Sequence, residues 1–221
     1  MCLVRELLDA GFGHVILADD GSDRDHRAPF DAFSTDGRVR VVRHETNRGK
    51  GSTLKTAFRY LLAHVPEAEH VVTADADGQH RASDILAVTT AAREEPGRLV
   101  LGSRIFGGDV PLRSRFGNAV TRHVFRAIAG RMLADTQTGL RAFPRAMLEP
   151  FVSIRGERYE YEMNVLAHAC RTAFPLEVPI ATIYVAGNAA SHFDPVRDSM
   201  RIYFGLLRFY FSSRLGGNAA G

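Results

Sequence analysis

Short apolar segments alternate with longer segments of helical periodicity along the first half of the chain. Residues 52–64 and 83–94 show the spacing typical of helices. Four apolar runs rich in β-branched residues are typical of strands and lie at 14–18, 39–43, 70–74 and 98–103. Alternating strands and helices indicate βαβ units, so the pattern predicts an α/β fold whose central sheet is mostly parallel and flanked by helices.

Polar, glycine-rich segments follow three of these predicted strands. They are "DDGSD" from Asp19, "NRGKG" from Asn47 and "DADGQH" from Asp75. Ligands of parallel sheets bind beyond the carboxyl ends of the strands. We therefore expect the three segments to lie together at one edge of the sheet.

The second half of the chain is less regular. Residues 116–130 and 157–172 have helical patterns, and 176–185 has a strand pattern that Pro179 interrupts. No internal repeat or low-complexity linker divides the chain, so most of it is expected to form one domain.

A final amphipathic helix is predicted near the C-terminus. Asp194 and Pro195 are suited to its cap and first turn. Its polar and small side chains form one narrow stripe among apolar and aromatic ones, which suits a membrane surface, a membrane-protein partner or packing on its own domain. The predicted division is a domain at 1–194 and a helix with its tail at 195–221.

Composition narrows the function classes only slightly. The formal charge of +3 over 221 residues is too small to indicate nucleic-acid binding by itself. Cys2 and Cys170 provide neither a disulfide framework nor a cysteine metal cluster, so a reducing cytosol is expected. No apolar run reaches the roughly 20 residues of a spanning helix, and charges in the first ten residues argue against a signal peptide.

The "DADGQH" segment has the side chains of a cation site. Alternate side chains of an extended segment point the same way, so Asp75, Asp77 and Gln79 are able to converge. Carboxylate oxygens suit Mg²⁺ or Mn²⁺, and Mg²⁺ commonly binds substrate phosphates as well. The alternative is a solvated turn before a helix, because Asp and Gly favour turns.

The other two polar segments have functional and plain interpretations. The glycines of "NRGKGST" allow backbone N–H groups to approach an anion, and Lys50 adds a point charge, although the segment is not a Walker A loop. A carboxylate of "DDGSD" is suited to bind a ribose or a base. The plain interpretation of "DDGSD" is an ordinary β-turn.

Taken together, the motifs resemble a known family. The series "DDGSD", "NRGKGSTLKTAF", "DADGQH", "LGSR" and "DTQTGLRAF" is similar to the family 2 glycosyltransferases of the GT-A fold. Within that family it most resembles the polyprenyl-phosphate sugar synthases of the dolichyl-phosphate mannose synthase type. The resemblance implies an inverting transferase that moves a sugar from a nucleotide-diphosphate sugar to a polyprenyl phosphate.

The resemblance also implies roles for individual residues. A group expected to bind the nucleotide consists of Asp20, Gly49, Lys50, Gly51, Asp75 and Ala76. The divalent metal, Mg²⁺ or Mn²⁺, would be held by Asp75, Asp77 and Gln79.

The acceptor side of the site is implied in the same way. Arg104 and Arg115 would bind the phosphate of the lipid acceptor. Asp135 and Gln137 would line the reacting centre with Arg104. A phosphate nucleophile is already anionic at neutral pH, so it needs positioning by arginines more than a general base.

Two other functions remain open. Transfer to a sugar hydroxyl in a cell-surface polysaccharide needs a general base, for which Glu160 and Glu162 are candidates. A non-catalytic module that binds nucleotide sugars is the other.

Members of the family normally open with an extra strand in the middle of the sheet, whereas this sequence opens in the helix that follows it. The first strand is therefore expected to be missing. The resemblance and the C-terminal helix together imply a cytoplasmic protein, peripheral at the inner face of the membrane, and a possible homo-oligomer.

Overall fold

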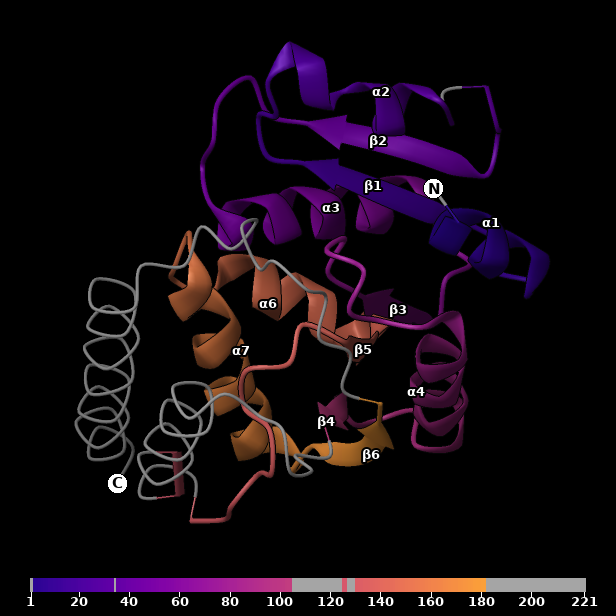
Figure 1. The fold of residues 1–221 in the computed structure, drawn as a ribbon. Coiled ribbons are helices and arrows are strands. Elements are labelled where there is room, and N and C mark those ends of the chain that lie inside the picture. The colour runs from indigo at the N-terminus through magenta and orange to yellow at the C-terminus, as the bar shows by residue number, and fades with distance from the viewer. Residues whose placement is uncertain (1, 34, 105–124, 127–129, 182–221) are drawn as a thin grey trace.

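A computed structural model describes residues 2–33, 35–104, 125–126 and 130–181 (Figure 1). Its helices are α1 Cys2–Asp9, α2 Ala28–Asp31, α3 Lys50–His64, α4 Ala82–Glu94, α6 Leu148–Ser153 and α7 Tyr159–Thr172, with short 3₁₀ turns at Arg24–His26 and Arg145–Met147. The strands are β1 Val15–Asp19, β2 Val39–Arg43, β3 His70–Thr73, β4 Val100–Arg104, β5 Arg141–Pro144 and β6 Leu176–Ile180.

The predicted elements of the first half are confirmed with small shifts at their ends. In the second half, α7 confirms the helix predicted over 157–172. The strand predicted over 176–185 is described only as far as Ile180. Most of the helix predicted over 116–130, and all of the helix predicted to begin at Pro195, lie outside the described residues.

The described strands form two sheets. β1 and β2 pair in parallel, with Val15 opposite Val39. The second sheet has the order β3-β5-β4-β6. Among the described residues no strand pairs with the side of β1 that faces away from β2. The predicted α/β class is confirmed. The predicted single central sheet is not, because the described strands form two sheets.

The second sheet is mixed. β4 and β6 run parallel, whereas β5 is antiparallel to both β3 and β4. The sequence pattern did not predict β5, because "RAFP" is short and begins with a charged residue. Among the described strands β6 lies at the edge of this sheet, a position that tolerates Pro179.

Alternate side chains of the second sheet enter two separate cores. Leu101 and Phe143 join the larger core with side chains of α3, α6 and α7. Val100 and Ala142 face the other way and pack with Ile85 and its neighbours on α4. Figure 1 shows the same layering, with α6 and α7 across the sheet from α4. Because successive side chains of a strand point to opposite faces of the sheet, the position of a residue along the strand decides which helices its side chain contacts.

Helix α3 connects the two sheets. It contacts β1 of the first sheet and packs against α6 and α7, which cover the second. Phe58 and Leu61 are buried on the side of α3 that faces the larger core. The N-terminus of α3 is thereby held between the ends of β1 and β3, where the polar segments lie.

Candidate active site

The first polar segment contains two carboxylates with different surroundings. Asp19 is 1% exposed, accepts the Ser22 backbone N–H at 2.8 Å and forms an ion pair with Arg43 at the end of β2. Burial opposes ionisation, but the hydrogen bonds from Ser22 and Arg43 lower the pKa of Asp19 below its usual value. Asp19 therefore ties the ends of β1 and β2 together.

Asp20 holds the second polar segment in place. Its Oδ1 accepts the Arg48 backbone N–H at 2.9 Å, and its Oδ2 accepts that of Gly49 at 2.7 Å. Oδ1 also lies 2.8 Å from Nδ1 of His44. Burial opposes ionisation, but the hydrogen bonds of Arg48, His44 and Gly49 lower the pKa of Asp20. The described contacts of Asp20 fix the loop before α3, and its role toward a nucleoside stays a prediction.

The glycines of the second segment allow close packing. Gly49 has φ 98°, and a Cβ there would lie 2.6 Å from the Glu157 carbonyl oxygen. A Cβ on Gly51 would lie 2.5 Å from Cβ of Tyr161. The start of α3 therefore rests directly on the start of α7. Whether this loop also binds a nucleotide stays a prediction.

Lys50 joins the second polar segment to the third. Its Nζ lies 2.7 Å from Oδ1 of Asp75 and 2.9 Å from Oε2 of Glu162. Burial disfavours the ammonium, but the charges of Glu162 and Asp75 raise the pKa of Lys50. Burial likewise disfavours the Asp75 carboxylate, and the charge of Lys50 lowers its pKa. These contacts and those of Asp20 confirm that the three strand-end segments meet, but they meet between the ends of strands of two sheets and not at one edge of a single sheet.

Asp77 and Gln79 lie on the turn that follows Asp75. Asp77 is exposed, and its Oδ1 accepts the Gln79 backbone N–H at 3.0 Å. His80 is buried, which lowers its pKa, while the charges of Asp75 and Asp77 oppose that shift. Both carboxylates thus lie close enough to His80 to influence it. The exposed Ala76 lies between them.

The prediction that Asp75 and Asp77 hold a divalent cation stays a prediction. Asp77 Oδ2 makes no hydrogen bond within the described part of the chain, and Asp75 is already shared with the cationic Lys50. The described residues do not, however, contain three or more His, Cys, Asp or Glu side chains grouped as metal ligands. Two carboxylates with substrate phosphates completing the coordination fit this arrangement better than a cage built by the protein alone.

The residues predicted for the acceptor side are organised around Arg104 at the end of β4. Its Nε lies 2.6 Å from Oδ2 of Asp135, and an η nitrogen lies 3.1 Å from Oδ1. Asp135 is completely buried and also accepts the Gln137 backbone N–H at 3.0 Å. The Glu177 side chain accepts the backbone N–H groups of Ala134 and Asp135. Arg104 and Asp135 therefore form one rigid unit, and Gln137 is exposed beside it.

One predicted site residue lies outside the part of the chain that the structure describes, and two residues with contacts in the site were not predicted in those roles. Arg115 lies outside the described residues. Glu162 was considered only as a base for a hydroxyl acceptor, yet it shares Lys50 with Asp75. Glu160 instead accepts the backbone N–H groups of Glu157 and Arg158 at the start of α7. His44 was missed, although its place directly after β2 was a usable signal.

Several known proteins are similar to this chain in sequence. The sequence profile of "Glycosyl transferase family 2" matches residues 4–151. An uncharacterized protein of Methanocaldococcus jannaschii is 31% identical over 190 residues, which cover 82% of this chain and 74% of that protein. The UDP-N-acetylglucosamine–dolichyl-phosphate N-acetylglucosaminyltransferase of Methanococcus voltae is 29% identical over 207 residues, covering 85% of this chain and 82% of that protein.

Solved structures share the fold at lower sequence identity. Glucosyl-3-phosphoglycerate synthase of Mycobacterium tuberculosis, in complex with Mn²⁺, UDP and phosphoglyceric acid, superposes with a TM-score of 0.66 at 18% identity. The match covers 93% of this chain and 73% of that one. Another complex of the same enzyme, with Mn²⁺ and UDP-glucose, gives a TM-score of 0.63 at 20% identity. The chain therefore has the GT-A fold.

Proposed function

Because this chain belongs to glycosyl transferase family 2, we propose that it transfers a sugar from a nucleotide-diphosphate sugar to a polyprenyl phosphate, with Mg²⁺ or Mn²⁺ as cofactor. The name of the Methanococcus voltae relative, which includes dolichyl phosphate, supports this acceptor class. The Mn²⁺ and UDP in the structurally similar synthase support a metal-assisted donor.

The observation that carries the proposal is the contact of Lys50 with Asp75 beside the exposed Asp77. In the proposed complex Asp75 and Asp77 hold the cation, with Gln79 in reach on the same turn. The bound cation would supply charge stabilisation for the departing diphosphate. Lys50 adds a positive charge on the same side, and Asp20 fixes the loop that carries it. The donor phosphates would thus meet two kinds of positive charge at the carboxyl ends of β1 and β3.

The acceptor phosphate is assigned to Arg104. Its guanidinium is held by the buried Asp135 through Nε and one η nitrogen, which leaves its planar fork in a fixed orientation. A fixed fork orients a phosphate oxygen toward the anomeric carbon at little entropic cost. Arg115 is proposed as a second contact. Asp135 acts through Arg104, and Gln137 is proposed to line the same space.

Transfer to a sugar hydroxyl is the second candidate, and one contact favours it. Glu162 lies in the cluster itself, 2.9 Å from Lys50, and is the carboxylate placed best to accept a proton from a hydroxyl. The contact with Lys50 also explains the position of Glu162 without any role as a base, and this explanation is compatible with a phosphate acceptor. Replacing Glu162 by Gln removes a partner of Lys50 for either acceptor, but turnover on a bound acceptor should be lost only for a hydroxyl, because only a hydroxyl acceptor requires a base.

The location of the protein is part of the proposal. No helix among the described residues is long and apolar enough to cross a membrane. We propose that the predicted helix at 195–213 brings the chain to the inner face of the membrane, where a polyprenyl phosphate is accessible.

Calorimetry with UDP- and GDP-sugars, with and without Mn²⁺, tests the donor site directly. We expect binding that requires the metal and is weakened at least about tenfold in Asp77→Ala, because one of two metal-binding carboxylates is lost. The control is Asp9→Ala, which removes an exposed carboxylate at the end of α1, outside the three polar segments. Metal-dependent binding without turnover on any lipid phosphate or sugar acceptor would instead indicate a non-catalytic module.

A further inference from the structure

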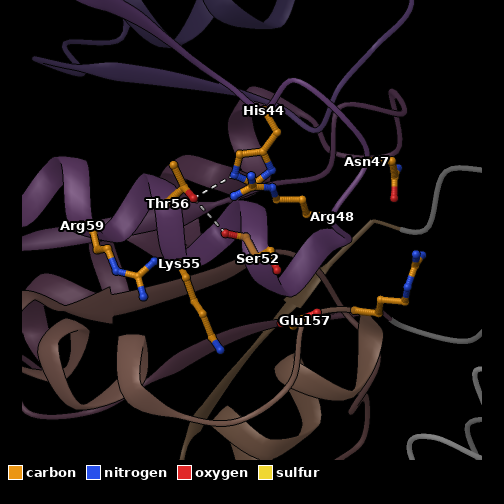
Figure 2. Close-up of a pocket in the computed structure, with 9 residues that line it drawn as sticks. His44, Asn47, Arg48, Ser52, Lys55, Thr56, Arg59 and Glu157 are labelled. Carbon is orange, nitrogen blue, oxygen red and sulfur yellow. Dashed lines mark hydrogen bonds between the residues drawn. The ribbon is translucent and has the colours of Figure 1, made fainter.

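A second polar cavity lies beside α3, outside the cluster of Lys50, Asp75 and Glu162. Its volume is about 570 Å³. Three segments form its wall: the loop after β2, one face of α3, and the turn before α7 (Figure 2). A cavity of this size accommodates a small ligand.

The cavity is separated from the donor side by the helix itself. Lys50 and Arg59 are nine positions apart on α3, about two and a half turns, so they leave the helix on opposite sides. Lys50 contacts Asp75 and Glu162, whereas Arg59 lines the cavity. Figure 2 shows Lys55 and Arg59 projecting from the same side of α3.

Positive charge dominates the lining. Arg48, Lys55, Arg59 and Arg158 line the cavity, and Glu157 is the acidic residue among its described lining residues. Within the described part of the chain none of the four basic side chains forms an ion pair with a carboxylate. Arg43 and Arg104, by contrast, each form an ion pair with an aspartate.

This arrangement carries an electrostatic cost without a ligand. Lys55 and Arg59 are four residues apart on one helix, where like charges are mutually destabilising. Burial and the charge of Arg59 lower the pKa of Lys55 below its usual value, while Glu157 and Glu160 only partly oppose this. Lys55 also lies 4.9 Å from the centre of the Tyr161 ring, which limits its freedom to move away. A bound anion would relieve this repulsion.

We propose that this cavity is a binding site for a phosphorylated anion, separate from the nucleotide-sugar site. Arginines and a lysine from three segments of the wall supply charged donors suited to the several oxygens of a phosphate or diphosphate group. The Thr56 hydroxyl borders the same space and lies 2.9 Å from Nε2 of His44. His44 in turn contacts Asp20, so a ligand here is linked by two side chains to the loop before α3.

The test uses the double variant Lys55→Gln/Arg59→Gln of the full chain. Calorimetry with inorganic pyrophosphate in EDTA, which removes the metal required by the donor site, should show binding to the wild type. The double variant should bind at least about tenfold more weakly, because two charged hydrogen-bond donors to the phosphate oxygens are lost. The matched control is Arg5→Gln/Arg93→Gln, which removes two exposed arginines on α1 and α4 and should bind like the wild type.

A second arm distinguishes a free anion from a lipid headgroup. Co-sedimentation is measured with vesicles of phosphatidylcholine containing phosphatidylglycerol, against vesicles of phosphatidylcholine alone. Binding that is lost in Lys55→Gln/Arg59→Gln but kept in the control variant supports the proposal in either experiment. Loss of pyrophosphate binding indicates a free anion, and loss of vesicle binding indicates a lipid headgroup.

Three outcomes would overturn the proposal. The wild type could bind in neither arm, both double variants could weaken equally, or pyrophosphate binding could be lost in Lys50→Met and kept in Lys55→Gln/Arg59→Gln. UDP-sugar binding with Mn²⁺ serves as the check on folding, and it should be unchanged in Lys55→Gln/Arg59→Gln. This result also keeps a failure here distinct from a failure of the proposed transferase activity.

Discussion

At the scale of single residues, the site is a set of paired charges. Asp20, Asp75 and Asp135 each have a described partner that keeps the carboxylate ionised or oriented. Such pairing places the charges precisely before any substrate arrives, which is what electrostatic catalysis requires. The pairing also makes the free energy of unfolding depend on pH and on the residue that pairs with each carboxylate.

Asp20→Asn is expected to lower the stability in a pH-dependent way. The folded pKa of Asp20 is lowered, so its contribution is fully present above the unfolded value of about 3.9 and is lost as the pH falls through the folded value. The difference in unfolding free energy between wild type and variant should be about 1–2 kcal/mol at pH 7 and should shrink below pH 4. Urea denaturation across this range measures it. An equal difference at every pH would contradict the prediction, and Glu94→Gln, an exposed position, is the control.

Arg104→Lys is expected to affect the acceptor more than the donor. Lysine keeps the charge beside the buried Asp135 but loses the bidentate fork. The KM for a polyprenyl phosphate should rise about tenfold, which corresponds to one lost charged hydrogen bond, while the KM for the nucleotide sugar stays within about twofold. Steady-state kinetics with each substrate varied in turn decides this, and equal changes in both constants would remove Arg104 from the acceptor site.

At the scale of elements, the position of α3 matters most. Its first turn carries Lys50 toward β3, and its opposite face lines the second cavity. The helix reaches this position because Gly51 allows it to approach the start of α7. A substitution at this contact would move both sites at once.

Gly51→Ala is therefore expected to destabilise the protein, although alanine is the better helix former. The new Cβ would lie 2.5 Å from Cβ of Tyr161 and 2.9 Å from the Glu157 carbonyl carbon. Overpacking of this kind costs about 1–3 kcal/mol. Thermal denaturation should show a lower Tm, with Gly97→Ala as the control, since nothing lies within 4 Å of a Cβ there. A raised Tm in Gly51→Ala would show that the two helices separate easily.

At the scale of the whole molecule, the site lies between two sheets. Asp20 follows β1 of the first sheet, Asp75 follows β3 of the second, and Lys50 lies between them. The sheets are not joined by strand pairing within the described residues. A ligand that contacts both ends would therefore add a second connection between sheets that α3 already joins.

Donor binding is accordingly expected to slow hydrogen exchange in both sheets. With Mn²⁺ and a nucleotide sugar, amides at the carboxyl ends of β1 and β3 should exchange about tenfold more slowly, because a ligand at ten times its Kd stabilises the bound state by about 1.4 kcal/mol. Mass spectrometry of deuterated peptides measures this, and at the same ligand concentration Asp77→Ala should reduce the slowing to about twofold or less. Protection limited to one sheet would contradict a site shared between the two.

The sequence by itself determined the alternation of strands and helices, the polar segments at the strand ends and the family they indicate. These are local properties, because periodicity, turn residues and motif spacing act over short stretches of chain. It also placed Asp75, Lys50 and Asp20 near one another, since the carboxyl ends of strands in an α/β fold share an edge. Only the tertiary structure decided that Glu162 shares Lys50, that Asp135 is buried against Arg104, and that the strands divide into two sheets. Those outcomes depend on which distant elements meet, and no short-range pattern encodes that choice.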